Sequence, residues 1–187
     1  MKLKTVLQGL CLAAIVAAVF FFRQGTALGQ VSDDKHSFKF SRFDFSFPST
    51  WQVMTPRPTE PDAVIGFVAP TSDNKESAQV IFFLANTPSG QNTMSAMTRW
   101  TSRFTEGKDK INYKEQPIQI SDQKLTVYTA DGTYKENSTA TPKRDYGLSC
   151  FVLTSETQTL FIRTMGPTNA TSSAASEVYH MLLNSIR

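Results

Sequence analysis

The sequence of 187 residues has few of the side chains on which catalysis and metal binding usually depend. It contains two histidines, His36 and His180, and two cysteines, Cys11 and Cys150. Neither histidine has a cysteine, histidine or carboxylate at metal-ligand spacing, so we predict no metal site and no bound cofactor. Because Cys11 lies in an N-terminal apolar segment, Cys150 has no cysteine to pair with, and we expect a buried, unreactive thiol.

Catalytic sequence motifs are also missing. The glycines are scattered and form no phosphate-binding loop. Ser149 follows Gly147, but Phe151 stands where a nucleophile elbow has its second glycine. The sequence therefore predicts a protein that is not an enzyme. A site built from arginines and carboxylates that are far apart in the sequence is kept as an alternative.

The surplus of positive charge is confined to the N-terminus. The chain has 19 Lys and Arg against 16 Asp and Glu, and residues 1–29 hold three of the basic residues and no acidic ones. The remaining 16 basic and 16 acidic residues cancel, so the rest of the chain is formally neutral. Nucleic-acid binding normally requires a basic surface, and we therefore predict no nucleic-acid partner.

Residues 1–29 have the pattern of a secretory signal peptide. Lys2 and Lys4 precede an apolar run over residues 6–22, and Ala27-Leu28-Gly29 is a small-x-small pattern suited to signal peptidase. We expect cleavage after Gly29 and export to the periplasm or the extracellular space. The apolar run is long enough for the alternative, an uncleaved membrane anchor that leaves the domain facing outward.

The remainder divides into a polar stretch and one domain. Residues 30–37 are polar, and we predict that they are disordered. Residues 38–187 have the length of a single domain and contain enough aromatic side chains for one core. No internal repeat and no linker divides them.

The hydrophobic pattern predicts strands in both halves of this domain. Residues 38–47 alternate between apolar and polar, which is typical of a hairpin or a bulged strand. Residues 63–69 and 78–85 are apolar on both faces, which indicates buried strands. Residues 148–154 and 159–165 form a second predicted hairpin, and the short connections favour antiparallel pairing.

Two segments have helical periodicity, residues 91–105 and residues 170–186. With the strands they predict an α+β fold in which an antiparallel β-sheet is covered by helices on both faces, an α/β/α sandwich. The following large or apolar side chains are expected in its core: Trp51, Trp100, Phe104, Cys150 and Phe161.

Three arginines are the candidates for binding a partner or a ligand. Arg99 and Arg103 share one face of the first predicted helix by their i,i+4 spacing. Arg163 lies in a predicted strand on the same face as Phe161 and Met165, where a charge must reach water or a partner. Ordinary salt bridges or snorkelling side chains are the alternative interpretation of all three.

Three short motifs occur in order along the domain. Residues 45–51 (FSFPSTW) join a hydrophobic strand to a turn and a tryptophan, residues 97–100 (MTRW) lie in the first helix, and residues 161–167 (FIRTMGP) precede the last helix. Together they resemble small exported bacterial PsbP-like domains of the PsbP/DcrB-like α-β-α sandwich superfamily, over residues 38–186. The resemblance implies an antiparallel sheet between helices and an accessory or partner-binding role. Relatives often have glutamine in the turn after Arg-Trp, where this chain has Arg103.

The sequence thus predicts an exported, non-enzymatic binding or accessory domain that docks on an envelope protein or a membrane complex. A small-molecule or lipid carrier, motivated by the aromatic strands, is an alternative to this function. The sequence predicts neither the identity of the partner nor the oligomeric state.

Overall fold

The computed structural model describes residues 29–31, 37–86, 90–107, 114–121 and 123–185. Residues 1–28 of the predicted signal peptide lie outside the described residues, and so does His36. The predicted disordered stretch is described only in part. There the structure differs from the prediction, because residues 30 and 31 belong to a strand and Ser37 begins another. In the described part of the chain, no helix is long and apolar enough to span a membrane.

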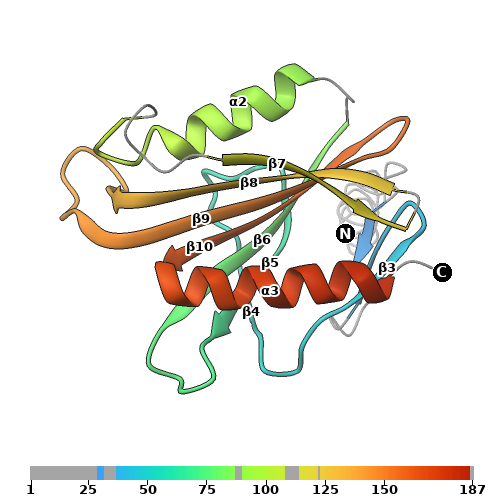
Figure 1. Ribbon diagram of the computed structural model, residues 1–187, viewed down its shortest axis with the longest axis horizontal. Coiled ribbons are helices and arrows are strands. Elements are labelled where there is room, and N and C mark those ends of the chain that lie inside the picture. Colours follow the sequence, from blue (N-terminus) through green and yellow to red (C-terminus); the bar gives the residue numbers. More distant parts are fainter. Residues whose placement is uncertain (1–28, 32–36, 87–89, 108–113, 122, 186–187) are drawn as a thin grey trace, which may run out of the picture.

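The fold is built on a seven-stranded sheet in which every neighbouring pair is antiparallel (Figure 1). The strands follow each other across the sheet in this order: β4 (Gln52–Met54), β5 (Ala63–Pro70), β6 (Ser77–Ala85), β10 (Thr159–Pro167), β9 (Lys143–Thr154), β8 (Gln123–Tyr134) and β7 (Lys114–Ile120). Strand β10 is central and is buried along almost its whole length. The prediction of an α+β fold with a large antiparallel sheet is confirmed.

A second, small sheet contains β1 (Gly29–Val31), β2 (Ser37–Phe40) and β3 (Phe43–Ser46). Strands β2 and β3 form a tight hairpin, and Ser41 at its turn has a φ of 52°, in the left-handed region that such turns use. The alternation puts Phe38 and Phe45 opposite each other on one face. Both rings pack edge-on against Phe82 of β6, with centroids 5.5 and 5.9 Å away, so the hairpin closes part of the core.

The C-terminal helix α3 (Thr168–Ser185) packs on the same face of the large sheet as this hairpin. Its buried side chains recur every four residues, at Ala170, Ala174, Val178 and Leu182, and form one stripe. They belong to the same hydrophobic cluster as Phe82. Each buried Val or Leu of such a stripe contributes about 1.5–3 kcal/mol, which holds the helix on the sheet.

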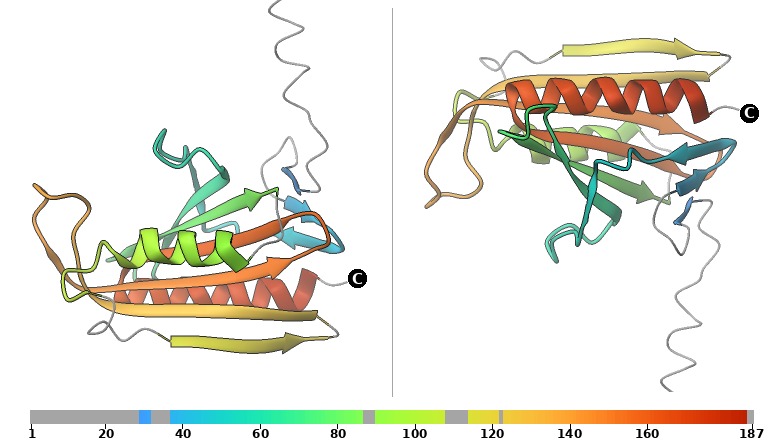
Figure 2. Two further views of the ribbon diagram at one scale, coloured as in Figure 1. Left: turned by 90° about the horizontal axis from the view of Figure 1, so that it is seen from above. Right: turned by 90° about the horizontal axis from the view of Figure 1, so that it is seen from below.

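Helix α2 (Gly90–Thr101) belongs to a different hydrophobic cluster. Its Trp100 lies with its ring centroid 5.2 Å from that of Phe83 and 6.1 Å from that of Phe161. Because side chains alternate along a strand, Phe83 and Phe161 point away from the face that carries Phe82 and Ile162. Helix α2 thus packs through Trp100 on residues of β6 and β10, in a cluster separate from the one that contains α3 (Figure 2).

Helix α2 ends at Thr101, four residues before the periodicity predicts. The chain beyond it pairs instead with the end of β8, where the amide of Lys135 donates to the carbonyl of Arg103 at 2.8 Å. Phe104 forms an isolated bridge with Tyr134 and is buried there. Arg103 is consequently held in a turn rather than on the helix.

Candidate functional site

Two of the three candidate arginines, Arg99 and Arg163, lie beside Trp100, and the three arginines line two different pockets. Arg99 on α2 is exposed, and its guanidinium carbon lies 5.9 Å from the ring centroid of Trp100. The guanidinium carbon of Arg163 lies 5.1 Å from the same centroid. Arg103 does not share a face with Arg99, because α2 ends between them. It lines the same pocket as Arg163.

Arg99 borders a half-open pocket of about 440 Å³ beside α2, which we call the α2 pocket. Its lining contains Asp62, Phe83, Asn86, Ser95, Arg99, Trp100 and Phe161. The aromatic rings belong to the buried cluster under α2 and form the apolar wall of the pocket. The charged and amide side chains come from the helix and from residues next to the strand ends. A pocket with an apolar wall and a few hydrogen-bonding groups is suited to recognition.

Arg163 on β10 is one of the most deeply buried side chains of the protein, with a relative exposure of 1%. Its Nη2 donates to Oε1 of Glu60 at 2.7 Å, in an ion pair that is almost out of contact with solvent. The guanidinium carbon also lies 4.9 Å from the ring centroid of Phe83. A carboxylate and two aromatic faces therefore surround a charge in the middle of the sheet.

The environment of Arg163 leaves part of its hydrogen-bonding capacity unused. Among the described residues, neither Nε nor Nη1 has a hydrogen-bond partner. Each unsatisfied buried donor costs about 1–3 kcal/mol. Burial lowers the pKa of the guanidinium and the carboxylate of Glu60 raises it, but an arginine stays protonated because its ordinary pKa is so high. The site thus holds a permanent cation with two free donors.

Arg163 and Arg103 line a small enclosed pocket of about 60 Å³, which we call the arginine pocket. Its charged and phenolic lining consists of Arg57, Glu60, Arg103, Tyr134, Glu136, Lys143, Tyr146 and Arg163. Nη1 of Arg103 donates to the hydroxyl of Tyr134 at 3.2 Å, and Arg57 forms an ion pair with Glu136. Burial, more than the neighbouring Tyr134, raises the pKa of Tyr146 and keeps its hydroxyl neutral.

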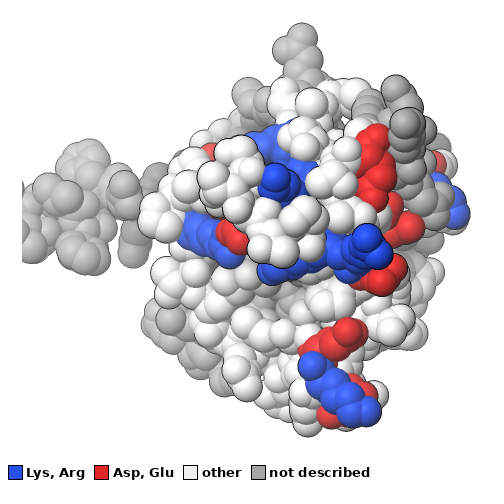
Figure 3. Space-filling view, turned by 90° about the vertical axis from the view of Figure 1, so that its left-hand side faces the viewer, with Lys and Arg blue, Asp and Glu red and all other residues white. Residues whose placement is uncertain are grey.

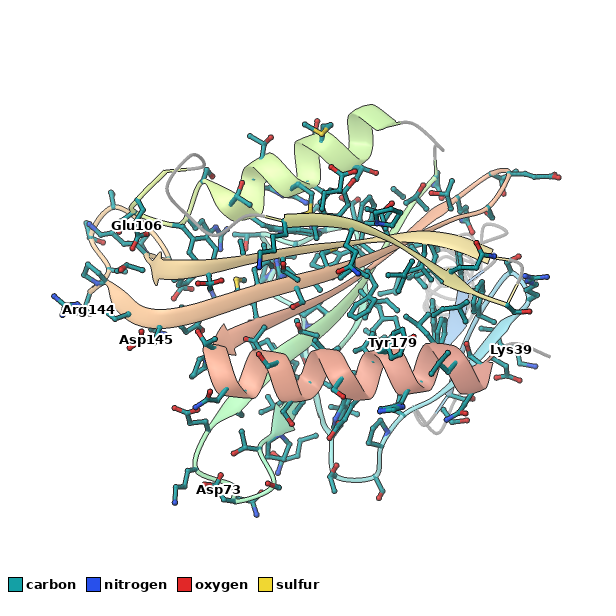
Figure 4. The ribbon with its side chains drawn as sticks, viewed as in Figure 1. Lys39, Asp73, Glu106, Arg144, Asp145 and Tyr179 are labelled. Atoms are coloured by element: carbon teal, nitrogen blue, oxygen red, sulfur yellow. The ribbon has the colours of Figure 1, made fainter. Side chains whose placement is uncertain are left out.

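The arginine pocket opens at the end of the sheet where the β8–β9 connection lies. Figure 3 faces this end and shows Lys and Arg side chains gathered near its middle, with acidic side chains beside them. In Figure 4, Arg144, Asp145 and Glu106 project from the same end. Hydrogen bonds from Thr133 lower the pKa of Glu106, so this carboxylate is ionised beside the basic residues.

The remaining predicted residues lie apart from these pockets. Cys150 is fully buried in the cluster under α2, and burial raises the pKa of its thiol. His180 is exposed on α3, where its ring stacks edge-on with that of Tyr179. Trp51, which directly precedes β4, is buried and donates its indole N–H to Glu177 of α3. Within the described residues, no group of three His, Cys, Asp or Glu side chains could hold a metal ion.

Several residues of the arginine pocket have no signal in the sequence. Glu60 and Arg57 lie in a proline-rich segment whose sequence predicts an exposed loop, and Lys143 lies at the polar start of β9. The sheet order brings these segments to Arg163, which is more than a hundred residues from Glu60 in the sequence. The available signal was an arginine on an apolar strand face, which indicated only that its charge must reach water or a partner.

No family model matches the chain, and no curated protein matches it. Several solved structures are similar to it, and two of them are LpqN and a cyanobacterial PsbP. LpqN, involved in cell envelope biogenesis of Mycobacterium tuberculosis, is 9% identical with a TM-score of 0.47 over 77% of this chain and 82% of LpqN. Cyanobacterial PsbP (CyanoP) from Synechocystis sp. PCC 6803 is 11% identical with a TM-score of 0.47 over 87% of this chain and 93% of that protein.

Proposed function

We propose that the protein is an exported, non-enzymatic accessory domain that binds another envelope protein through the α2 pocket. The observation that carries the proposal is the position of Arg99, an exposed arginine at the rim of an aromatic-walled pocket of about 440 Å³. Arginine and tryptophan are among the residues that contribute most to protein interfaces. Here Arg99 is the exposed member of the pair, whereas the buried Trp100 anchors the helix on Phe83 and Phe161.

The chemistry of the α2 pocket favours a particular occupant, a segment of the partner that carries a carboxylate next to an apolar side chain. The apolar side chain fits against Phe83 and Phe161, and Arg99 pairs with the carboxylate. Asn86 and Ser95, which also line the pocket, supply hydrogen bonds for the backbone of the bound segment.

We also infer that the two helices complete an α/β/α sandwich by covering both faces of the sheet. Trp100 of α2 packs on Phe83, and Val178 of α3 belongs to the cluster on the opposite face. This arrangement fixes α2, and with it the position of Arg99.

The experiment is a pull-down from crosslinked envelope membranes with the full chain tagged at its C-terminus. Wild type is compared with Arg99→Gln and with Arg42→Gln, a matched loss of one exposed arginine in the turn between β2 and β3, which lines neither the α2 pocket nor the pocket around Arg163. Because a hydrogen-bonded charge contributes about 1.5–3 kcal/mol, Arg99→Gln is expected to reduce recovery of the partner roughly tenfold or more. Arg42→Gln should recover it as wild type does. Equal recovery with all three proteins would contradict the proposal.

A small-molecule carrier is the second candidate, because the α2 pocket falls within the range of roughly 300–1,000 Å³ that small ligands occupy. Native mass spectrometry of the purified protein distinguishes the two. A co-purifying ligand that is lost in Arg99→Gln would favour the carrier, and a bare chain would favour the partner-binding domain.

A further inference from the structure

The arginine pocket has a charge that its own residues do not neutralise. Four cationic side chains line it (Arg57, Arg103, Lys143 and Arg163), against two carboxylates (Glu60 and Glu136). Both carboxylates are already engaged, Glu60 with Arg163 and Glu136 with Arg57. The two cations that remain therefore give the pocket an excess of positive charge.

The two remaining cations contact only neutral partners among the described residues. Arg103 donates to the hydroxyl of Tyr134, and the ammonium of Lys143 lies 5.6 Å from the ring centroid of Tyr146. Neither contact neutralises a charge. Both side chains lie at the pocket lining, where they could pair with an anion that enters.

Arg163 supplies the independent indication of a ligand. It is buried, it lines the pocket, and its Nε and Nη1 lack partners among the described residues. Because Glu60 uses only Nη2, the remaining N–H groups of the guanidinium can donate to the oxygens of a further anion, and such charge-assisted hydrogen bonds are strong. A folded protein rarely keeps such donors buried and unpaired unless something else satisfies them.

The volume limits what can enter. The pocket of about 60 Å³ exceeds the roughly 10–15 Å³ that one water requires. It is far below the roughly 300–1,000 Å³ of sites that hold whole small molecules. A single planar anionic group fits these limits.

We propose that the arginine pocket is a carboxylate-binding site, in which Arg163 and Arg103 donate to the carboxylate and Lys143 adds charge at the entrance. The carboxylate belongs either to a free small acid or to an acidic side chain of a bound protein, and the chemistry of recognition is the same for both. The proposal is independent of the α2 pocket, because neither Arg103 nor Lys143 lines that pocket.

The test is an NMR titration of the full chain that follows the Nε–H resonance of Arg163, assigned by its loss in Arg163→Lys. Acetate should shift this resonance saturably, with a dissociation constant in the millimolar range, whereas equal concentrations of chloride should not. Arg103→Gln and Lys143→Gln should each weaken acetate binding at least threefold. Lys143 is exposed, so this variant tests the site even if Arg103→Gln fails to fold. Arg42→Gln, the matched control at an exposed arginine that lines neither pocket, should bind acetate as wild type does.

Two further arms define the ligand. A short glutamate-containing peptide that saturates the signal below the acetate concentration indicates an acidic protein segment, and a response to acetate alone indicates a free small acid. The proposal would be overturned by a response no different from that to chloride, by phosphate binding more tightly than acetate, or by equal weakening in Arg42→Gln.

Discussion

Replacing Arg163 should destabilise the fold more than any other single change at the two pockets. In Arg163→Ala, the carboxylate of Glu60, whose side chain is only 12% exposed, loses its partner and stays in a largely dry site. Breaking a buried ion pair by removing one member costs about 3–5 kcal/mol. The lost contacts with Phe83 and Trp100 add to this, since a desolvated cation–π contact contributes up to about 2 kcal/mol.

The assay is urea unfolding followed by tryptophan fluorescence, because Trp100 contacts the altered side chain. We expect Arg163→Ala to lower the free energy of unfolding by about 3–5 kcal/mol, which is on the order of 10 °C in Tm for a domain of this size. The double variant Arg163→Met/Glu60→Gln removes both charges and should recover more than half of the loss.

A surface ion pair provides the control. Lys75 and Asp73 are paired at 3.3 Å with side chains 81% and 54% exposed, and such pairs contribute about 0–1 kcal/mol. Lys75→Ala should therefore change the unfolding free energy by less than about 1 kcal/mol. A loss of less than about 1 kcal/mol in Arg163→Ala as well would refute the reasoning, because it would mean that Glu60 is solvated after all.

Three other predictions concern packing and protonation. Burial raises the pKa of the Cys150 thiol, so as pH rises above about 8.5 this thiol ionises only in the unfolded chain. Its contribution to the free energy of unfolding is therefore complete below that pH and is lost above it. The unfolding free energy of wild type should fall relative to Cys150→Ala by up to about 1.4 kcal/mol per pH unit there, and a constant difference would contradict this. Trp51→Phe removes the indole donor to Glu177 and should cost about 1–3 kcal/mol in urea unfolding, whereas an unchanged midpoint would show that the hydrogen bond contributes nothing. Gly166→Ala would place a methyl 2.9 Å from the Cα of Ala78 and should cost about 1–3 kcal/mol; an unchanged Tm would mean that β6 and β10 shift apart freely.

The fold class was predictable because its signals are local. Period-two alternation identified the hairpin at residues 38–47, and the apolar runs identified β5 and β6. The four-residue spacing of small and apolar side chains identified α3. These patterns depend only on which face of an element is buried, and neighbouring residues carry that information.

The end of α2 was not predictable, because a tertiary contact decides it. Phe104 keeps the helical spacing after Trp100, but its bridge to Tyr134 competes successfully with another helical turn. As a result of the earlier helix end, Arg103 lines the arginine pocket instead of sharing a face with Arg99.

The pockets depend on sheet order, which the sequence does not display. Arg163 could be recognised as an arginine that needs a partner, but nothing local assigns that partner to Glu60 in a proline-rich segment. The excess of cations around it appears only when the fold brings the segments after β4 and after α2 to strands β9 and β10. Candidate residues were therefore identified individually, while their grouping into two pockets required the structure.

The most direct test of the central claim, that the α2 pocket is the partner-binding surface, is site-specific photocrosslinking in intact cells. A photoreactive side chain is placed at Ser95, which lines the α2 pocket, or at Ser172, which is exposed on α3. We predict that one partner crosslinks to the Ser95 variant, that Arg99→Gln abolishes the crosslink, and that the Ser172 variant gives none. Equal crosslinking of the same partner from Ser172, or a Ser95 crosslink that survives Arg99→Gln, would contradict the account.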